Sequence, residues 1–292
     1  MRSRHPPRPR SAAAPRAARL VSGTRIGWFS TCAPTVALRA ARRLVVVACI
    51  VAPGPVSAQR GFRGEGFNRA EILLDVNVPY DGAFEFARIR YASSLGMLGR
   101  GPLWSHDYAR AEANFSRILA EVSTVPTRTR ASAVFGLDDP LLFQHSVAYI
   151  VEVGYWVPEE PEVRALRTWL RRGGFLIVDD FQENDFVNFE RQMKRVLPDA
   201  VLQPVPREHP VFDAFYRFTD FQAVRHPYSG YRTQYWGVFE GNDPTGRLMV
   251  IANYNGDIAE YWEFSDRGFF PVAESNEAYK LGVNYIVYGL TR

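Results

Sequence analysis

Two long apolar runs in the middle of the chain predict strands that are buried on both faces. The first is SVAYIVEVGYW, residues 146–156, and the second is FLIVDDF, residues 175–181. Continuous apolar runs of this kind are typical of parallel strands that helices cover on both sides. A third segment, FEFARIRY at 84–91, has no clean apolar face, but its β-forming residues favour a strand as well.

Helical patterns separate these strands. Between 115 and 122, apolar residues recur at the spacing of one helix face, and Ser105 or Asp107 is expected to cap the start of this helix. Residues 158–174 have a proline in the first turn, acidic residues near the start, basic residues near the end and a glycine pair as a stop. Residues 184–198 place large apolar side chains on one face, which predicts another helix.

Aromatic-rich runs replace this pattern in the last third of the chain. The segments 234–241, 247–255 and 257–264 are separated by turn residues, so they predict short strands that are partly antiparallel. A last helix is expected from about 276 to 290. The alternation of strands and helices before it predicts an α/β fold with a mostly parallel sheet, whose ligands bind at the carboxyl ends of the strands.

Residues 1–58 differ in composition from the rest of the chain. They contain ten Arg and no Asp or Glu, and an apolar stretch from Leu44 to about Ala52 precedes the small residues Val56, Ser57 and Ala58. This is the pattern of a secretory signal peptide, and the apolar stretch is shorter than the ~20 residues that span a membrane.

This leader predicts where the chain is cleaved, where the protein is located and how its domain is bounded. We expect cleavage near Ala58-Gln59 and a secreted or periplasmic protein, with a lipid anchor at Cys49 as the alternative. A flexible lead-in at 59–83, which has room for an edge strand, would then precede one α/β domain at 84–292. No transmembrane helix is expected in this mature chain.

Removing the leader also changes the charge. The whole chain has 35 basic and 31 acidic residues; without the leader's ten Arg, 25 basic residues face 31 acidic ones, a net charge of −6. The basicity therefore belongs to targeting, and nucleic acid is not an expected partner. Both cysteines, Cys32 and Cys49, also lie in the leader, so the mature chain would have no disulfide, thiol nucleophile or cysteine metal ligand.

The rule for parallel sheets selects candidate ligand-binding residues by their position near strand ends. The pair Asp179-Asp180 stands out because a buried strand runs directly into two carboxylates. One interpretation is structural, with one Asp capping a backbone segment and the other orienting a loop; the others are a ligand or metal contact, or catalysis as nucleophile or acid/base. The full set of candidates is Arg90, Trp104, His106, Asp107, Tyr155, Trp156, Asp179, Asp180 and His209.

Several of these candidates have competing interpretations. His106 and Asp107 either pair, so that the Asp fixes the imidazole tautomer, or Asp107 caps the following helix while Trp104 packs the loop down. Tyr155-Trp156 is expected to be the most exposed aromatic pair, suited to stacking on a sugar ring. His209-Pro210 fits a proline-fixed turn. The mature histidines 106, 145, 209 and 226 are isolated in sequence, so no metal site and no cofactor are expected.

Several separated blocks of the chain resemble the DUF4159 family, a domain of unknown function, over residues 84–291. They are FEFARIRY, GRGPLWSHDYARAEANFSRIL, STVPT, GGFLIVDDF, EHPVFDAFYRF and YKLGVNYIVYGL. The resemblance implies a flavodoxin-like, class I glutamine amidotransferase-like three-layer sandwich, similar to trehalose-utilisation-like proteins. In such folds a cysteine sits on the turn after the strand that FLIVDDF would form. With no cysteine there, amidotransfer by a thiolate is excluded.

These observations favour a secreted binding module over an enzyme. The domain is expected to bind a small molecule, with carbohydrate as one option, or an envelope protein at a degenerate amidotransferase-like site. The alternatives are a hydrolase or carbohydrate-active enzyme that uses Asp179 or Asp180 with His106, and a structural subunit of an envelope assembly. A serine hydrolase is disfavoured because the Gly-x-Ser-x-Gly elbow is missing from the sequence.

Overall fold

The computed structural model describes residues 74–93 and 101–292. The leader at 1–58, its cleavage site, both cysteines and most of the lead-in at 59–83 lie outside these ranges, so the structure does not test the predictions made for them. Within the described residues, no helix is both long and apolar enough to cross a membrane.

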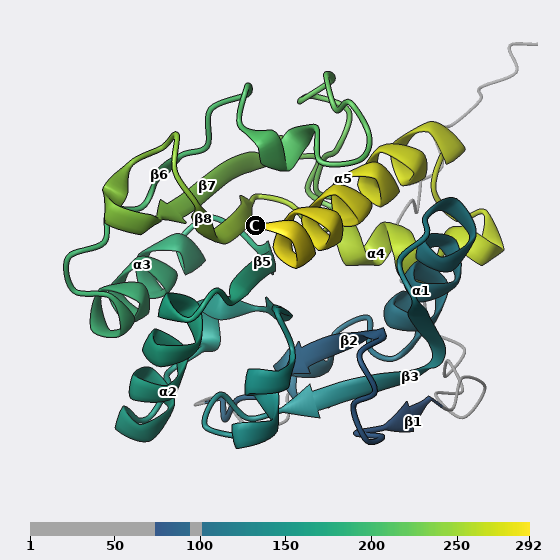
Figure 1. The fold of residues 1–292 in the computed structure, drawn as a ribbon. Helices are drawn as coiled ribbons and strands as arrows, with labels where there is room; N and C mark the ends of the chain where they lie inside the picture. Colours follow the sequence, from purple (N-terminus) through teal and green to yellow (C-terminus); the bar gives the residue numbers. More distant parts are fainter. Residues whose placement is uncertain (1–73, 94–100) are drawn as a thin grey trace, which may run out of the picture. The chain divides into compact units, whose positions relative to one another are not determined.

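An eight-stranded sheet forms the centre of the domain, in the order β1-β3-β2-β4-β5-β8-β7-β6 (Figure 1). The first six strands in this order are mutually parallel, whereas β7 is antiparallel to both β8 and β6. The sheet is therefore mostly parallel, as predicted. The strands are β1 (Asp75–Val76), β2 (Phe84–Ile89), β3 (Thr127–Phe135), β4 (Val147–Val151), β5 (Phe175–Phe181), β6 (Gln203–Pro204), β7 (Gln234–Phe239) and β8 (Leu248–Tyr254).

The five central parallel strands follow the order β3-β2-β4-β5-β8. Numbered along the chain, this is the order 2-1-3-4-5 of doubly wound flavodoxin-like sheets, with which the fold is compatible. The order reverses between β2 and β4, so this is where such a sheet places its ligand crevice. The structure thus directs attention to the carboxyl ends of β2, β4 and β5.

Helices cover both faces of the sheet, which makes three layers. Side chains of α1, α4 and α5 share one core cluster with the sheet, and side chains of α2 and α3 share the other. Alternate residues of β4 divide between the two, because Tyr149 faces the first cluster and Ala148 and Ile150 face the second. The helices are α1 (Arg110–Val122), α2 (Glu160–Arg171), α3 (Asp185–Val196), α4 (Ile258–Glu263) and α5 (Val272–Thr291).

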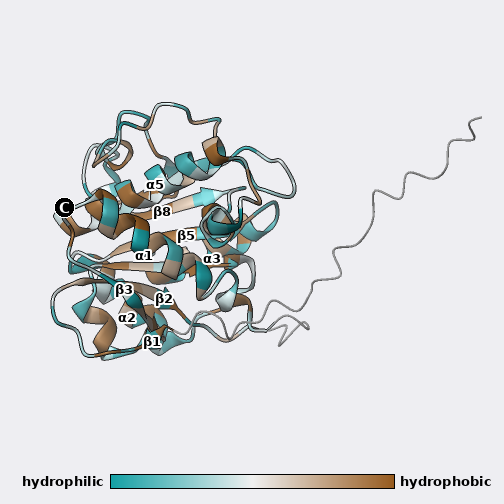
Figure 2. Cartoon of the chain, turned by 90° about the vertical axis from the view of Figure 1, so that its right-hand side faces the viewer, coloured by the Kyte–Doolittle hydropathy of each residue, from teal (hydrophilic) through white to brown (hydrophobic). Residues whose placement is uncertain are grey.

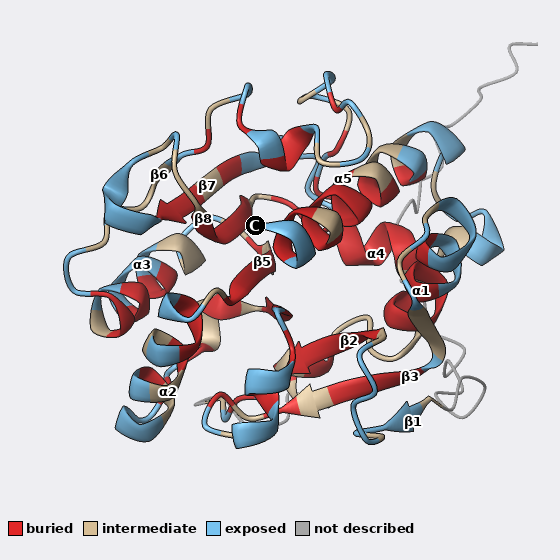
Figure 3. Ribbon diagram, viewed as in Figure 1, coloured by how far each residue is buried: buried red, intermediate tan, exposed pale blue. Residues whose placement is uncertain are grey.

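The burial pattern explains why the apolar runs form strands. Every residue of β4 is buried, and so is every residue of β5 except Asp180 (Figure 3). The buried hydrophobic residues come from the strands and from the helices on both faces, and Figure 2 shows hydrophobic stretches on both kinds of element. Helix α2 begins with a capping box, in which the Glu162 side chain accepts the backbone N–H of Glu159 at 2.8 Å.

Two sequence predictions about secondary structure are wrong, and one strand was missed. The segment 257–264, predicted to be a strand, contains the helix α4 (Ile258–Glu263) instead. Strand β3 was not predicted, because Arg128 and Arg130 interrupt its apolar pattern. Neither Ser105 nor Asp107 caps α1, whose N-cap is Ala109 with no side-chain hydrogen bond.

Candidate functional site

Asp179 is a structural residue that joins four elements of the fold. Its side chain is fully buried at the end of β5. Its Oδ2 accepts hydrogen bonds from the Tyr149 hydroxyl at 2.6 Å and from the backbone N–H groups of Ile258 and Ala259 at 2.8 and 3.2 Å, while Oδ1 accepts from Asn253 at 3.0 Å. This carboxylate therefore anchors the first turn of α4 to the centre of the sheet.

Asp180, the next residue, points to a different environment and meets His106. The Nδ1 atom of His106 lies 3.2 Å from Asp180 Oδ2 and 2.9 Å from Glu152 Oε1. Both oxygens only accept hydrogen bonds when ionised, so Nδ1 carries the proton that they share. Hydrogen bonds to Asp180 and then to Glu152 raise the pKa of His106 to about 10, and desolvation raises the pKa of Asp180 to about 6 despite the nearby histidine.

The strand register brings these side chains together. Val151 at the end of β4 pairs with Asp179 on β5, so Glu152 and Asp180 are the next residues on adjacent strands. The backbone N–H of Glu152 donates to the Asp180 carbonyl at 3.1 Å. Both residues have left-handed backbone conformations, with φ of 53° and 50°, and Asp107 has φ of 60°. Such conformations are strained for non-glycine residues and gather at functional sites.

A second set of side chains meets Asp180 from the other direction. Donor atoms of Asp180, His226 and Asp257 all lie within 4.8 Å of one another. Asp257 is only 4% exposed, and its Oδ1 accepts the backbone N–H of Glu260 at 3.0 Å, which caps α4. Its other oxygen has no hydrogen-bond partner among the described residues. Asp180 is thus shared by two groups of potential ligands.

A third group lies beside the other two. Asp107, Glu260 and Glu263 place carboxylate oxygens within 4.8 Å of one another, and the Oδ2 atom of Asp107 is inaccessible to solvent and has no hydrogen-bond partner. The Tyr228 hydroxyl donates to Glu260. We call the combined set the acidic cluster: His106, Asp107, Glu152, Asp180, His226, Asp257, Glu260 and Glu263.

Negative charge exceeds positive charge in the acidic cluster. Between described residues, no ion pair joins an Arg or Lys to Asp107, Glu152, Asp180 or Asp257. Desolvation, followed by repulsion from neighbouring carboxylates, raises the pKa of Asp107 and of Asp257 well above the usual range. A nearby cation would stabilise each of these carboxylates, and without a cation a bound proton would do so.

Several candidate residues have other partners or another exposure than the sequence indicated. His106 pairs with Glu152 and Asp180, so the His106–Asp107 pair, one of the two alternatives left open by the sequence, does not form. Trp156 is fully buried in the core, so Tyr155-Trp156 is not an exposed pair; Tyr155 alone is partly exposed. Trp104 is partly exposed and packs against Tyr108, with ring centroids 6.0 Å apart.

His209 and Arg90 lie apart from the acidic cluster. His209 is buried, its Nδ1 accepts the backbone N–H of Val211, and its ring packs against Phe239 and Tyr288. It is a structural residue at the start of a short 3₁₀ helix, as the proline-turn interpretation predicted. The Arg90 side chain is exposed, and only its backbone N–H, which donates to Phe135, contributes to the sheet.

Glu152, His226, Asp257, Glu260 and Glu263 were missed by the sequence reasoning. Glu152 directly follows the predicted strand β4, so the strand-end rule had the signal that selects it. The other four residues lie in or before segments whose secondary structure was predicted wrongly or not at all. The histidines are also far apart in the sequence, so their spacing did not indicate that His106 and His226 both lie near Asp180.

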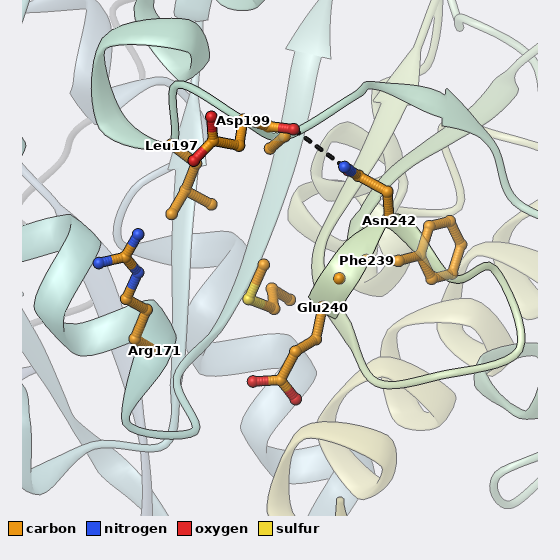
Figure 4. Close-up of a pocket in the computed structure, with 9 residues that line it drawn as sticks. Arg171, Leu197, Asp199, Phe239, Glu240 and Asn242 are labelled. Carbon is orange, nitrogen blue, oxygen red and sulfur yellow. Dashed lines mark hydrogen bonds between the residues drawn. The ribbon is translucent and has the colours of Figure 1, made fainter.

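A separate small pocket of about 170 Å³ lies at the opposite edge of the sheet (Figure 4). Arg171 precedes β5 and Phe239 ends the antiparallel β7, so this pocket is near the amino ends of β5 and β8. The Asn242 side chain closes one side by donating to the Asp199 carbonyl at 2.9 Å. Since the acidic cluster lies at the carboxyl ends, the two sites are distinct.

The comparisons with known proteins give a family and no activity. A family model described as a domain of unknown function, DUF4159, matches residues 85–290. The chain has no significant match among curated proteins. The site must therefore be interpreted from its own geometry.

Proposed function

Because the chain belongs to the DUF4159 family, whose description assigns no activity, we infer its function from the site. We propose that this domain is a binding module for a small, positively charged ligand. The ligand would bind at the carboxyl ends of β4 and β5, beside the first turn of α4. The observation that carries the proposal is the excess of partly or fully buried carboxylates in the acidic cluster. No ion pair between described residues joins an Arg or Lys to Asp107, Glu152, Asp180 or Asp257.

The location of the cluster supports the same function. It lies beside the point where the strand order reverses, which is where open α/β sheets bind ligands. Uncompensated carboxylates raise the free energy of the folded protein, and proteins tolerate this where a ligand supplies the missing charge. Three left-handed non-glycine residues, Asp107, Glu152 and Asp180, add local strain at the same place.

Catalysis is the less favoured interpretation. Of the side chains predicted to act together, His106 and Asp180 meet, but Asp179 is committed to four hydrogen bonds within the fold. Thiol-dependent amidotransfer is not proposed, because both cysteines, Cys32 and Cys49, precede the domain. The strand order supports a flavodoxin-like fold in which an amidotransferase-type site has become a binding site.

A carbohydrate ligand is the second candidate, since exposed tyrosines flank the cluster. Tyr228 is 66% exposed and its hydroxyl donates to Glu260, while Tyr231 is 42% exposed and donates to Glu183 at 2.7 Å. Aromatic rings beside carboxylates suit a sugar, which offers an apolar face and hydroxyl donors. The signal-like leader supports a location outside the cytoplasm, where either ligand class would be met.

A thermal-shift panel separates these ligand classes. Spermidine, arginine and lysine would be compared with glucose, trehalose and glutamate on the purified protein, and Asp180→Asn and Asp257→Asn variants would be run in parallel. We expect the cations to raise the melting temperature of the wild type, and to lose this effect in both variants. Stabilisation by the sugars alone would replace the first candidate with the second.

A further inference from the structure

Three side chains of the acidic cluster have the geometry of a metal site. His106 Nδ1 lies 2.9 Å from Glu152 Oε1 and 3.2 Å from Asp180 Oδ2. Divalent ions such as Zn²⁺ hold nitrogen and oxygen ligands at roughly 2.0–2.2 Å, which places neighbouring ligand atoms roughly 3 Å apart around the ion. The two separations from His106 Nδ1 are therefore close to those that bound ligands would have, and the donor atoms of Glu152 and Asp180 also lie within 4.8 Å of each other.

Asp257 provides an independent reason to place a cation there. Asp257 is only 4% exposed, and one of its two carboxylate oxygens has no hydrogen-bond donor among the described residues. A largely buried carboxylate with a single hydrogen bond is poorly compensated, so a nearby cation would stabilise it. Because Asp257 lies within 4.8 Å of the donor atom of Asp180, an ion bound to Asp180 would supply the missing positive charge.

From this geometry we propose that His106, Glu152 and Asp180 bind one divalent transition-metal ion, which replaces the proton on His106 Nδ1 and releases it to solvent, with Asp257 beside the ion as a charge-compensating neighbour. The proposal rests on the proposed function and narrows its positively charged ligand to a metal ion. One imidazole nitrogen and two carboxylates favour Zn²⁺ or Mn²⁺ over Ca²⁺, which prefers a larger set of oxygens. Three protein ligands leave a coordination position open for a further molecule.

His226 is near the site but is not a ligand of this ion. Its Nδ1 accepts the backbone N–H groups of Tyr228 and Ser229 at 3.3 and 3.4 Å. A nitrogen that accepts hydrogen bonds carries no proton, so the proton of the neutral ring is on Nε2. The donor atom of His226 is grouped with those of Asp180 and Asp257 and not with those of His106 and Glu152, so it lies outside the proposed ligand set. The structure thus predicts one ion per chain, although two groups of side chains share Asp180.

Metal titration of the chelator-treated protein tests the proposal. Calorimetry with ZnCl₂ and MnCl₂ should give one site per chain and a rise in melting temperature that CaCl₂ does not produce. His106→Gln, Glu152→Gln and Asp180→Asn should each weaken binding by more than the roughly 10- to 100-fold that changes outside the ligand set cost. Asp199→Asn, at the exposed Asp199 beside the distinct pocket of Figure 4, is the matched control and should keep the wild-type stoichiometry.

Circular dichroism of each variant without metal distinguishes lost binding from lost folding, and any two folded ligand variants suffice for the test. The proposal is overturned if no ion binds, if two ions bind, or if Asp199→Asn weakens binding as much as Asp180→Asn. If organic cations stabilise the protein and metals do not, the proposed function stands and the metal site fails. If neither class of cation binds, both fail.

Discussion

The Asp179 carboxylate accepts the backbone N–H of Ile258 at 2.8 Å, which ties the end of β5 to the first turn of α4 across 79 residues of sequence. The adjacent Asp180 instead faces His106 at 3.2 Å. Consecutive residues of one strand therefore have separate tasks. Asp179 holds the fold together, and Asp180 belongs to the proposed binding site.

This division predicts that the two substitutions differ in their effect on stability. Asp179→Ala removes the acceptor of four buried donors, so we expect it to lower the free energy of unfolding by roughly 3 kcal/mol or more. Asp180→Asn removes a charge that neighbouring carboxylates repel, so we expect little loss of stability and a loss of cation binding. Urea denaturation measures the first effect and the ligand titrations measure the second. Equal destabilisation by both substitutions would contradict the division.

Much of the sheet could be predicted from the sequence because burial on both faces leaves a direct signal. The apolar runs at β4 and β5 and the helix between them follow from hydrophobicity and end signals alone. The segment of α4 could not be predicted, because its aromatic residues resemble those of a strand. What makes it helical is tertiary: Asp257 caps it and the distant Asp179 binds its first N–H groups.

The candidate site was only half predictable for a similar reason. Position after a buried strand selects Asp180, and the loop motif selects His106. Their contact with Glu152 depends on the pairing of Val151 with Asp179, which no local pattern encodes. Asp257 joins only because α4 is placed against the carboxyl end of the sheet. Strand-end rules thus find members of the site one at a time, whereas register and helix placement assemble them.

The burial of the His145 ring predicts a loss of folding stability in acid. The ring is 7% exposed between Tyr80 and Phe135, with centroids 5.0 Å away, and burial lowers the pKa of His145 from 6.5 to about 4. Between these values the unfolded chain binds a proton that the folded protein excludes. Stability from this residue is therefore complete above pH 6.5 and falls by roughly 3 kcal/mol as the pH drops to 4.

A His145→Phe variant isolates this contribution from the other titrating groups. The phenylalanine keeps the ring contacts and cannot be protonated. We expect the free energy of unfolding, measured by urea titration at several pH values, to differ little from wild type at pH 7 and to exceed it progressively below pH 6.5. Parallel pH profiles of the two proteins would show that His145 is protonated in the folded state.

The buried ion pair between Arg88 and Glu112 predicts a strongly non-additive response. Both side chains are fully buried, Arg88 Nε donates to Glu112 Oε1 at 2.7 Å, and the guanidinium lies over the ring of Tyr149. Removing one partner leaves a buried charge uncompensated, so Glu112→Leu or Arg88→Met alone should cost roughly 3–5 kcal/mol. The double variant should be more stable than either single one in a denaturation cycle. Additive losses would mean that each charge is compensated elsewhere.

The packing around Gly282 predicts that α5 has no room for a Cβ atom at this position. A Cβ at this position would lie 2.5 Å from both Phe115 Cε2 and Trp262 Cζ2, and both rings are buried. Gly282→Ala gains about 1 kcal/mol of helix propensity, but the overpacking costs more, so we expect a net loss of roughly 1–2 kcal/mol. Asn276→Ala is the matched control, since it adds alanine to an exposed position of the same helix and should be neutral or slightly stabilising. Urea denaturation of the two variants decides the question, and stabilisation by both would show that α5 can move away from the rings.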